Sequence, residues 1–246
     1  MQFDVISLFP DMLVFAASYG VTGKAIEKGI VALSVWNPRD FTHDTHRTVD
    51  DRPYGGGPGM VMKYEPLRET LDQAKNASSR IAKVVYLSPQ GKPITQNLLS
   101  QASKLEQLIL IAGRYEGIDE RFVESCCDEE WSLGDFVISG GELAALAVID
   151  AITRLQPGVL GAEDSAKQDS HVNGLLDCPH YTRPENINGK WVPNVLLSGN
   201  HSEIARWRLK QSLGKTWQKR PDLLQNKKMN KEQQELLDEF IIELDG

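Results

Sequence analysis

Short apolar runs alternate with helical patterns over the first two-thirds of the chain. Residues 83–87 and 108–112 are almost continuously apolar, which is typical of central strands in a parallel sheet that is covered on both faces. Residues 5–9 and 31–36 have the composition of two further strands, and each ends at a turn that contains proline. Helical patterns lie at residues 65–75, 95–105 and 142–155. This alternation predicts an α/β fold.

The last third of the chain has a different pattern. Residues 161–169 are small, polar and acidic, and residues 178–184 are rich in turn formers. Two helical patterns follow at residues 202–212 and 231–244. We therefore expect a first domain at residues 1–160, a flexible linker at 161–175 and a small, mainly helical domain at 176–246.

Composition limits the class of protein. The chain has 246 residues, of which 41% are hydrophobic and 25% charged, and this suits a folded protein with a real core. Its cysteines, Cys126, Cys127 and Cys178, form no Cys-x-x-Cys pair, which favours a reducing compartment. We read no export signal, and no apolar run approaches the roughly 20 residues of a membrane span. We predict a soluble protein of the cytoplasm with no membrane partner.

The net charge of −7 hides a basic segment. Residues 201–231 contain nine Lys or Arg and two acids, so this stretch carries +7 and the remainder carries −14. A local basic stripe is what binding to nucleic-acid phosphates requires, whatever the global charge. A solvated helix face would have the same composition, and both interpretations stay open at this point.

Glycine or turn residues occur at three expected strand ends, at 87–91, 112–117 and 132–141. In open α/β sheets, ligands bind beyond the carboxyl ends of the strands. Glycines there let the backbone approach a flat ligand and offer it N–H and C=O groups. Ordinary turns would explain each loop taken alone, but three together could meet over one adenine-like ring.

Three other groups of residues could carry chemistry. The glycine-rich run 50–60 matches neither a P-loop nor a dinucleotide fingerprint, so it is either a ligand loop or a structural turn. His43 and His46 could indicate a metal, but no further His/Cys pair completes a four-ligand set, and we predict no metal site. Arg154 ends an apolar helix and Asp169 follows the expected linker, and each would by itself be read as a surface residue.

Taken together, these segments resemble the bacterial tRNA (guanine-N1)-methyltransferase family of the SPOUT class. The resemblance covers nearly the whole chain, and long matches in this order are very specific. The segments that carry it are residues 6–10, 36–40, 48–60, 86–91, 113–121, 140–143, 174–184 and 207–210.

The resemblance implies a SPOUT domain with a deep trefoil knot, an exception to the rule that chains do not knot, followed by the small helical domain. It also implies a homodimer, in which the partner's linker and C-terminal domain complete each site. S-adenosylmethionine would lie bent within the knot. The residues expected to bind it are Tyr86, Leu87, Ser88, Pro89, Gly113, Tyr115, Glu116, Gly117, Ser132, Leu133, Gly134, Asp135, Phe136, Val137, Ile138, Gly140 and Gly141.

The substrate that the resemblance implies is tRNA, methylated at N1 of the guanosine on the 3′ side of the anticodon, position 37. Asp169 matches the family's proposed general base, which must lie within hydrogen-bond reach of N1–H. Arg154 matches an arginine that faces the negative charge developing on O6. Expected tRNA contacts, to the target nucleotide or to phosphates, are Asp50, Gly55, Gly57, Gly59, Arg183, Arg206, Arg208, Lys210, Lys215 and Arg220.

Some points stay open in the sequence. A magnesium requirement belongs to the resemblance, although no ligand cluster in the chain suggests one. Gln168 stands where the family often has an acid, and Ala144 replaces a common proline. The alternatives are an RNA-binding protein that has lost catalysis, a nucleotide-dependent dehydrogenase suggested by the α/β alternation alone, and a relative that methylates another RNA base or a ribose.

Overall fold

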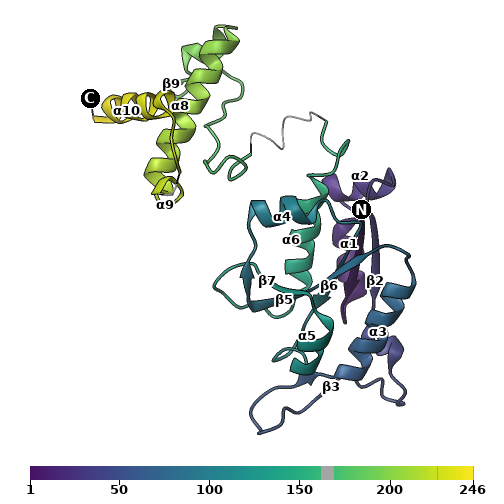
Figure 1. Cartoon of the computed structure of the whole chain (residues 1–246). Coiled ribbons are helices and arrows are strands. Elements are labelled where there is room, and N and C mark those ends of the chain that lie inside the picture. The colour runs from purple at the N-terminus through teal and green to yellow at the C-terminus, as the bar shows by residue number, and fades with distance from the viewer. Residues whose placement is uncertain (162–168, 226, 246) are drawn as a thin grey trace. The chain divides into compact units, whose positions relative to one another are not determined.

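The computed structural model describes residues 1–161, 169–225 and 227–245. The chain divides into two compact units, Met1–Glu163 and Asp164–Gly246. The first unit carries one five-stranded sheet in the order β2-β1-β6-β5-β7, with parallel pairing throughout (Figure 1). Its strands are β1 (Gln2–Ile6), β2 (Ala32–Trp36), β5 (Ala82–Pro93), β6 (Gln107–Ala112) and β7 (Glu129–Ser132).

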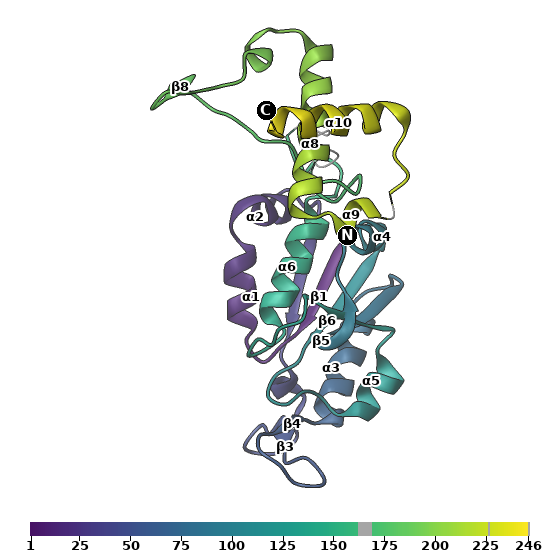
Figure 2. The ribbon, with the colours of Figure 1, turned by 90° about the vertical axis from the view of Figure 1, so that its left-hand side faces the viewer.

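Helices cover both faces of this sheet (Figure 2). One face packs against α1 (Pro10–Ala17), α2 (Gly20–Glu27), α4 (Gln96–Ala102) and α6 (Glu142–Thr153). The other face packs against α3 (Tyr64–Asn76) and α5 (Glu120–Cys126). Short elements complete the unit: the 3-10 turn η1 (Pro38–Phe41) and the antiparallel pair β3 (Asp50–Asp51) and β4 (Val61–Met62).

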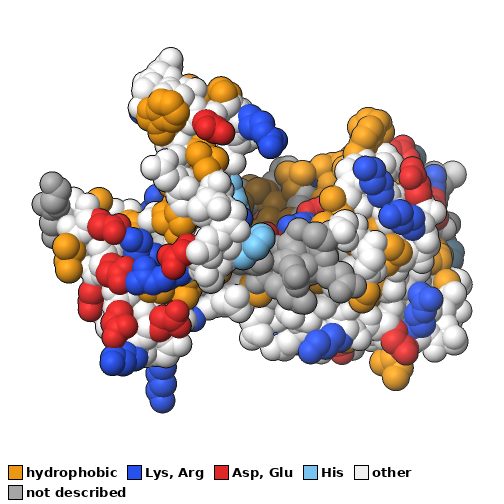
Figure 3. All heavy atoms as spheres, turned by 90° about the horizontal axis from the view of Figure 1, so that it is seen from above, with side chains coloured by type: hydrophobic (Ala, Val, Ile, Leu, Met, Phe, Trp, Pro, Cys, Tyr) orange, Lys and Arg blue, Asp and Glu red, His pale blue; other side chains and the backbone are white. Residues whose placement is uncertain are grey.

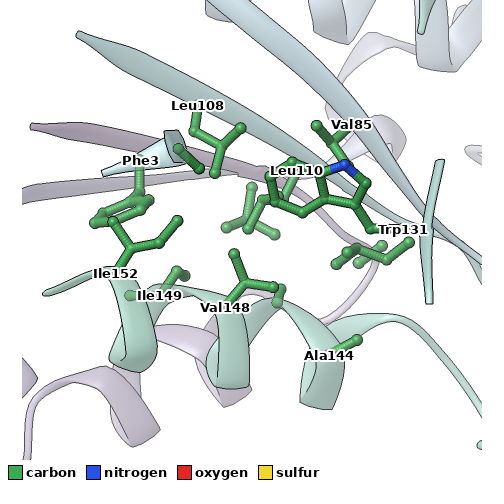
Figure 4. Close-up of a cluster of buried hydrophobic side chains, with 14 of the residues drawn as sticks. Phe3, Val85, Leu108, Leu110, Trp131, Ala144, Val148, Ile149 and Ile152 are labelled. Atoms are coloured by element: carbon green, nitrogen blue, oxygen red, sulfur yellow. The ribbon is translucent and has the colours of Figure 1, made fainter. Parts of the chain in front are cut away.

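The central strand β6 shows why the apolar run at 108–112 was informative. Successive residues of a strand point to opposite faces, so Leu108 and Leu110 enter one core while Ile109 and Ile111 enter the other. Figure 4 shows side chains of the sheet, among them Trp131, facing α6 in the first core. The two-sided burial confirms the expected α/β fold with a parallel sheet.

Several elements of this unit were not predicted from the sequence. Helix α1 leaves Met12, Val14 and Phe15 exposed, so its apolar side chains do not follow a single face. Strand β7 begins with two acids, which hid it in the sequence. Acids are tolerated there because β7 lies at the edge of the sheet, where Glu129 pairs with two lysines instead of entering the core. Helices α2 and α5 are each short and show too few turns for a periodic pattern.

The second unit is a small helical assembly. It contains β8 (Asn186–Ile187), β9 (Lys190–Trp191), η2 (Asn194–Leu197), α8 (His201–Lys219), α9 (Asp222–Gln225) and α10 (Lys231–Asp245). Asn200 caps α8 by accepting hydrogen bonds from the backbone N–H groups of Ser202 and Glu203. Leu213 of α8 packs with Leu175, Leu236 and Leu237 to form the core.

The expected linker, 161–175, falls partly inside this unit. Residues 162–168, and with them Gln168, lie outside the described residues. Beyond them, the Val172 N–H bonds to the carbonyl of Asp169, the His171 N–H bonds to the carbonyl of Leu175, and Leu175 is buried. Among the helices of the described part of the chain, none is long and apolar enough to cross a membrane.

Candidate functional site

A cavity of about 210 Å³ lies at the carboxyl ends of β6 and β7 and at the point in β5 where its pairing with β6 stops. Three segments form its walls: residues 86–89 of β5, the loop after β6, and the chain between β7 and α6. This is where an open parallel sheet normally holds a ligand. The lining residues are Tyr86, Leu87, Ser88, Pro89, Gly113, Arg114, Tyr115, Glu116, Gly117, Trp131, Ser132, Leu133, Phe136, Val137, Ile138, Ser139, Gly140, Gly141 and Ala144.

The three segments singled out in the sequence thus meet around one cavity. Of the residues expected at a cofactor, only Gly134 and Asp135 are not among those that line it. Arg114 and Ser139 line it although the sequence patterns did not select them as ligand residues. Gly134, at a φ of 152°, forms a turn in which its carbonyl accepts a hydrogen bond from Ser132.

Strand β5 contributes its part of the wall through a change of register. It pairs with β7 up to Leu87, and the pairing resumes only at Lys92, opposite Trp131. The irregular stretch between them includes Ser88 and Pro89, which line the cavity. A register shift of this kind re-aims side chains at the edge of a sheet.

Close backbone packing joins the loop after β6 to the start of α6. The Gly141 N–H donates a 2.9 Å hydrogen bond to the carbonyl of Gly113. A Cβ on Gly113 would lie 2.9 Å from the ring of Tyr86, so the position has no room for a side chain. Burial, aided by the nearby Glu130, raises the pKa of Tyr86 to about 12, and its hydroxyl therefore stays protonated at neutral pH.

A buried ion pair connects two walls of the cavity. The Arg114 Nε lies 2.8 Å from the Glu142 Oε2, and Glu142 has no exposed side-chain surface. The Arg114 Nε and the Glu142 Oε2 do not have the geometry of a hydrogen bond, so the two side chains attract each other by charge alone. Arg114 also donates to the carbonyl of Ser139 at 3.1 Å and stacks on Phe9, 4.5 Å from the ring centre, while Ser7 donates to the Glu142 Oε1 at 2.7 Å.

The glycine-rich run 50–60 borders the same cavity. The Glu116 N–H donates to the carbonyl of Met60, and the Met62 N–H donates to the carbonyl of Gly117, both at 3.0 Å. Gly59 has a φ of 83° and presses against Glu116, since a Cβ at position 59 would lie 2.8 Å from the carboxyl carbon of Glu116. The run is therefore held against a loop that lines the cavity.

Comparison with known proteins finds a matching family and several similar sequences. Residues 1–226 match the model of the family described as tRNA (Guanine-1)-methyltransferase TrmD. The tRNA (guanine-N(1)-)-methyltransferase of Tolumonas auensis is 59% identical over 246 residues, which are all of this chain and 99% of the relative. The enzyme of the same name from Methylococcus capsulatus is 62% identical over 240 residues, 98% of this chain and 96% of the relative.

The chain belongs to the TrmD family. The family is one of S-adenosylmethionine-dependent tRNA (guanine-N1)-methyltransferases with a SPOUT fold, and this confirms the family and the enzyme class expected from the sequence. Of the expected fold, the α/β class with a parallel sheet and the helical C-terminal region are confirmed. A related tRNA (guanine-N(1)-)-methyltransferase from a Marinomonas strain is 61% identical over 243 residues, 99% of this chain and 97% of the relative.

The two residues expected to act on guanine in the TrmD family lie on different units. Arg154 ends α6 in the first unit, is half-buried, and donates its backbone N–H to the carbonyl of Asp150 at 3.0 Å. Asp169 lies in the second unit beside a hollow that Asn173, Asp177 and Arg208 also line. Each residue keeps its proposed role as a prediction.

The basic residues expected to contact tRNA fall into two groups. Arg206 pairs with Glu239 at 2.5 Å, Lys210 with Glu243 at 2.6 Å, and Arg220 with Asp222 at 2.7 Å. Acidic and basic side chains accordingly intermingle over the helices of this unit (Figure 3). The second group is formed by the exposed Arg183 and Arg208 and the half-buried Lys215.

Within the described residues, one group of side chains has metal-ligand character: Asp177, Cys178 and His180. Burial opposes ionisation of Asp177, but hydrogen bonds from His180 and from the Cys178 N–H hold its pKa below the usual value. Burial raises the pKa of the Cys178 thiol, and a protonated thiol is a poor metal ligand. The Asp177 carboxylate already accepts a hydrogen bond from His180, 2.7 Å away.

Proposed function

We propose that this chain transfers a methyl group from S-adenosylmethionine to N1 of the guanosine at position 37 of tRNA. The observation that carries the proposal is the cavity at the ends of β6 and β7, where residues 86–89 of β5 and two glycine-containing loops meet in a chain of the TrmD family. The glycine-rich run 50–60 lies against this cavity through Gly59 and Glu116, and its place there suits a nucleotide presented to the methyl donor.

The donor set of the cavity fits S-adenosylmethionine. Leu87, Trp131 and Ile138 give apolar walls for a flat adenine ring, and the glycine backbone offers hydrogen-bonding groups to its edge. Bound there, S-adenosylmethionine would supply an electrophilic methyl group on a sulfonium. Tyr86, protonated at neutral pH, adds a neutral donor and no competing negative charge.

We also propose that these segments form the trefoil knot of the SPOUT class. The end of β7 is tied to the residue that follows β5, since the Ile94 N–H donates to the carbonyl of Ser132 at 2.8 Å. The chain after β7 is tied to the loop after β6 by the bond from the Gly141 N–H to the Gly113 carbonyl. A chain held between these two loops before it enters α6 has the course that threading would require.

Asp169 would be the general base. N1 of guanine carries a proton and becomes a nucleophile only when that proton leaves, which a carboxylate within hydrogen-bond reach can accept. Arg154 would face O6, where negative charge then develops, and stabilise it electrostatically. The base at position 37 must be unstacked to reach either group.

The active form would be a homodimer. Helix α1 exposes Phe15, which forms an edge-to-face pair with the exposed Tyr19, the residue that precedes α2, with ring centres 5.2 Å apart. Phe9 and Leu143, from segments beside the cavity, are also about half exposed. Contiguous exposed apolar surface marks an interaction site, and a second copy of the chain would cover it while bringing its own Asp169 to the cavity.

The second unit would hold the tRNA stem. Arg206, Lys210 and Arg220 pair with acids of α10 and α9. We expect the remaining predicted cations, Arg183, Arg208 and Lys215, to bind phosphates. Gly55 and Gly57, in the run 50–60, and Asp50 of β3 would contact the target nucleotide and its neighbours. A magnesium requirement stays a prediction, and the Asp177, Cys178 and His180 group does not suit an ion that prefers oxygen ligands.

Methyl mapping tests this function directly. The protein would be incubated with S-adenosylmethionine and two tRNA transcripts that differ only in having guanosine or adenosine at position 37. Product N1-methylguanosine, identified by mass spectrometry of the digested RNA, is expected with the first transcript alone. Methyl incorporation into the adenosine transcript at the same rate, or at another base or a ribose, would refute the assignment.

A further inference from the structure

We propose that Glu142 is a positioning residue, which acts through Arg114 to hold two walls of the cavity at the separation that S-adenosylmethionine requires. The inference rests on the proposed function, since it takes the ligand of this cavity to be S-adenosylmethionine. Glu142 does not line the cavity itself, whereas Arg114 does. The two residues are 28 positions apart in the chain and come from different segments of the wall.

The burial of Glu142 is the first observation. It is the first residue of α6 and has no exposed side-chain surface, in a helix whose buried neighbours are Ala144, Ala145 and Val148. Burying a carboxylate is unfavourable unless the charge is paired and hydrogen-bonded. The Glu142 carboxylate meets this condition by dividing the two contacts between its oxygens: Oε2 forms the ion pair with the Arg114 guanidinium, and Oε1 accepts the hydrogen bond from Ser7.

The two glycines before Glu142 are the second observation. A Cβ on Gly140 would overlap the Nε, Cδ and Cζ atoms of Arg114, so only glycine lets that side chain cross to Glu142. A Cβ on Gly141 would lie 2.7 Å from the Cα of Ala112, at the end of β6. The two glycines therefore let the chain before α6 approach the end of β6 closely, and Glu142 holds the Arg114 side chain where the two backbones meet.

The arrangement joins three parts of the unit. Ser7 follows β1, Arg114 lies in the loop after β6, and Ser139, whose carbonyl accepts from Arg114, precedes α6. Phe9 covers the guanidinium from the remaining side. If the charge on Glu142 is removed, Arg114 loses its ionic partner. The walls that contain Gly113 and Ser139 then keep the backbone bond from the Gly141 N–H to the Gly113 carbonyl but lose the ion pair that fixes the Arg114 side chain between them.

The test compares Glu142→Gln with a matched buried carboxylate, Asp4→Asn. Asp4 is 2% exposed and accepts from Trp36 Nε1 and Gln107 Nε2 at 2.7 and 2.8 Å, towards the amino end of the sheet. For Glu142→Gln we expect the KM for S-adenosylmethionine and the Kd for S-adenosylhomocysteine to rise about tenfold, with kcat within about threefold of wild type. For Asp4→Asn we expect a lower melting temperature and both constants within about twofold.

Equal losses of melting temperature in both variants, with cofactor constants unchanged in Glu142→Gln, would overturn the inference. If Glu142→Gln fails to fold, Ser7→Ala takes its place. It keeps the ion pair and removes two hydrogen bonds, the one to Glu142 and the one that the Ser7 Oγ accepts from the Phe9 N–H, and we expect the Kd for S-adenosylhomocysteine to rise about threefold. An unchanged Kd in that variant would also overturn the inference. Glu142→Asp should recover part of the affinity.

Calorimetric titration with S-adenosylhomocysteine involves no tRNA. A wild-type protein that binds it and yet leaves guanosine 37 unmethylated would contradict the proposed function and leave the role of Glu142 intact. If the wild-type protein methylates guanosine 37 and Glu142→Gln leaves the cofactor constants unchanged, the proposed function is supported and the role of Glu142 is contradicted.

Discussion

Lys210 of α8 donates a 2.6 Å hydrogen bond to the carboxylate of Glu243 of α10, and only 10% of the Lys210 side chain is exposed. Arg208, two residues earlier on the same helix, is exposed. The basic charges of α8 therefore divide between holding α10 in place and facing outward, although the sequence presents them as one stripe.

Arg208→Ala is expected to weaken tRNA binding and to reduce the slope of log affinity against log salt concentration by about one, because one phosphate contact is lost. Binding would be measured by fluorescence anisotropy at several salt concentrations. Lys210→Ala serves as the control. It should lower the free energy of unfolding by about 1 kcal/mol or less, because the ion pair with the exposed Glu243 is lost, and leave the salt slope nearly unchanged. An Arg208→Ala protein with the wild-type salt slope would favour a merely solvated helix face.

Asp169→Ala is expected to lower the rate of methyl transfer by at least about a hundredfold, which is the typical contribution of a general base. Single-turnover kinetics with the guanosine-37 transcript would measure it, and anisotropy should show that tRNA still binds. Asp222→Ala removes another carboxylate of the second unit, the partner of Arg220 on α9, and should turn over normally. Unchanged turnover in Asp169→Ala would rule out this residue as the base.

Gly59→Ala should lower kcat/KM for tRNA by about tenfold or more. The substitution strains a backbone at a φ of 83° and pushes a methyl group into the Glu116 side chain. Gly189, between β8 and β9, has a φ of 81° and open space around it, so Gly189→Ala carries the same backbone cost without the collision. Equal activity of the two variants would show that the contact between Gly59 and Glu116 has no role in catalysis.

Glu129 predicts a pH dependence of stability. Burial alone would raise its pKa, but hydrogen bonds from Lys83, Lys92 and Trp131 lower it to about 2, against an ordinary value of 4.5. The folded state therefore binds this proton more weakly than the unfolded state, and the contribution is fully present above about pH 4.5 and is lost as the pH falls towards 2. The stability difference between wild type and Glu129→Gln, from urea unfolding, should be largest near pH 7 and shrink below pH 4.5. A difference that stays constant down to pH 3 would contradict this account.

The sequence made the buried strands visible and left the edge of the sheet obscure. The run at 108–112 belongs to β6, whose six residues are all buried, and continuous burial produces a continuous apolar run. Strand β7 gives no such signal, because Glu129 and Glu130 lie only half-buried at the edge. Helix α1 was missed because apolar residues occupy its exposed face as well as its buried one. Val14 and Phe15 are exposed, so the alternation of apolar and polar positions that marks a surface helix is absent.

The position of the cavity followed from glycines at strand ends, but its internal chemistry did not. Arg114 and Glu142 are unremarkable charges in the sequence, and no local pattern indicates that a residue in a loop and one at a helix start will meet in a buried pair. Such long-range pairing depends on the path of the backbone between them. The sequence placed Arg154 in the first domain and Asp169 in the linker, and the structure puts Asp169 in the second unit.

Much of the cavity wall is main chain, at Gly113, Gly117, Gly140 and Gly141. An inhibitor that gripped those peptide groups would be hard to escape by point mutation, because no substitution deletes a backbone atom. A larger residue at position 140 would collide with the Arg114 side chain, and one at position 141 would collide with the backbone of Ala112. Resistance would have to arise at the side chains of the rim, where Phe136 and Val137 are exposed and free to vary in size.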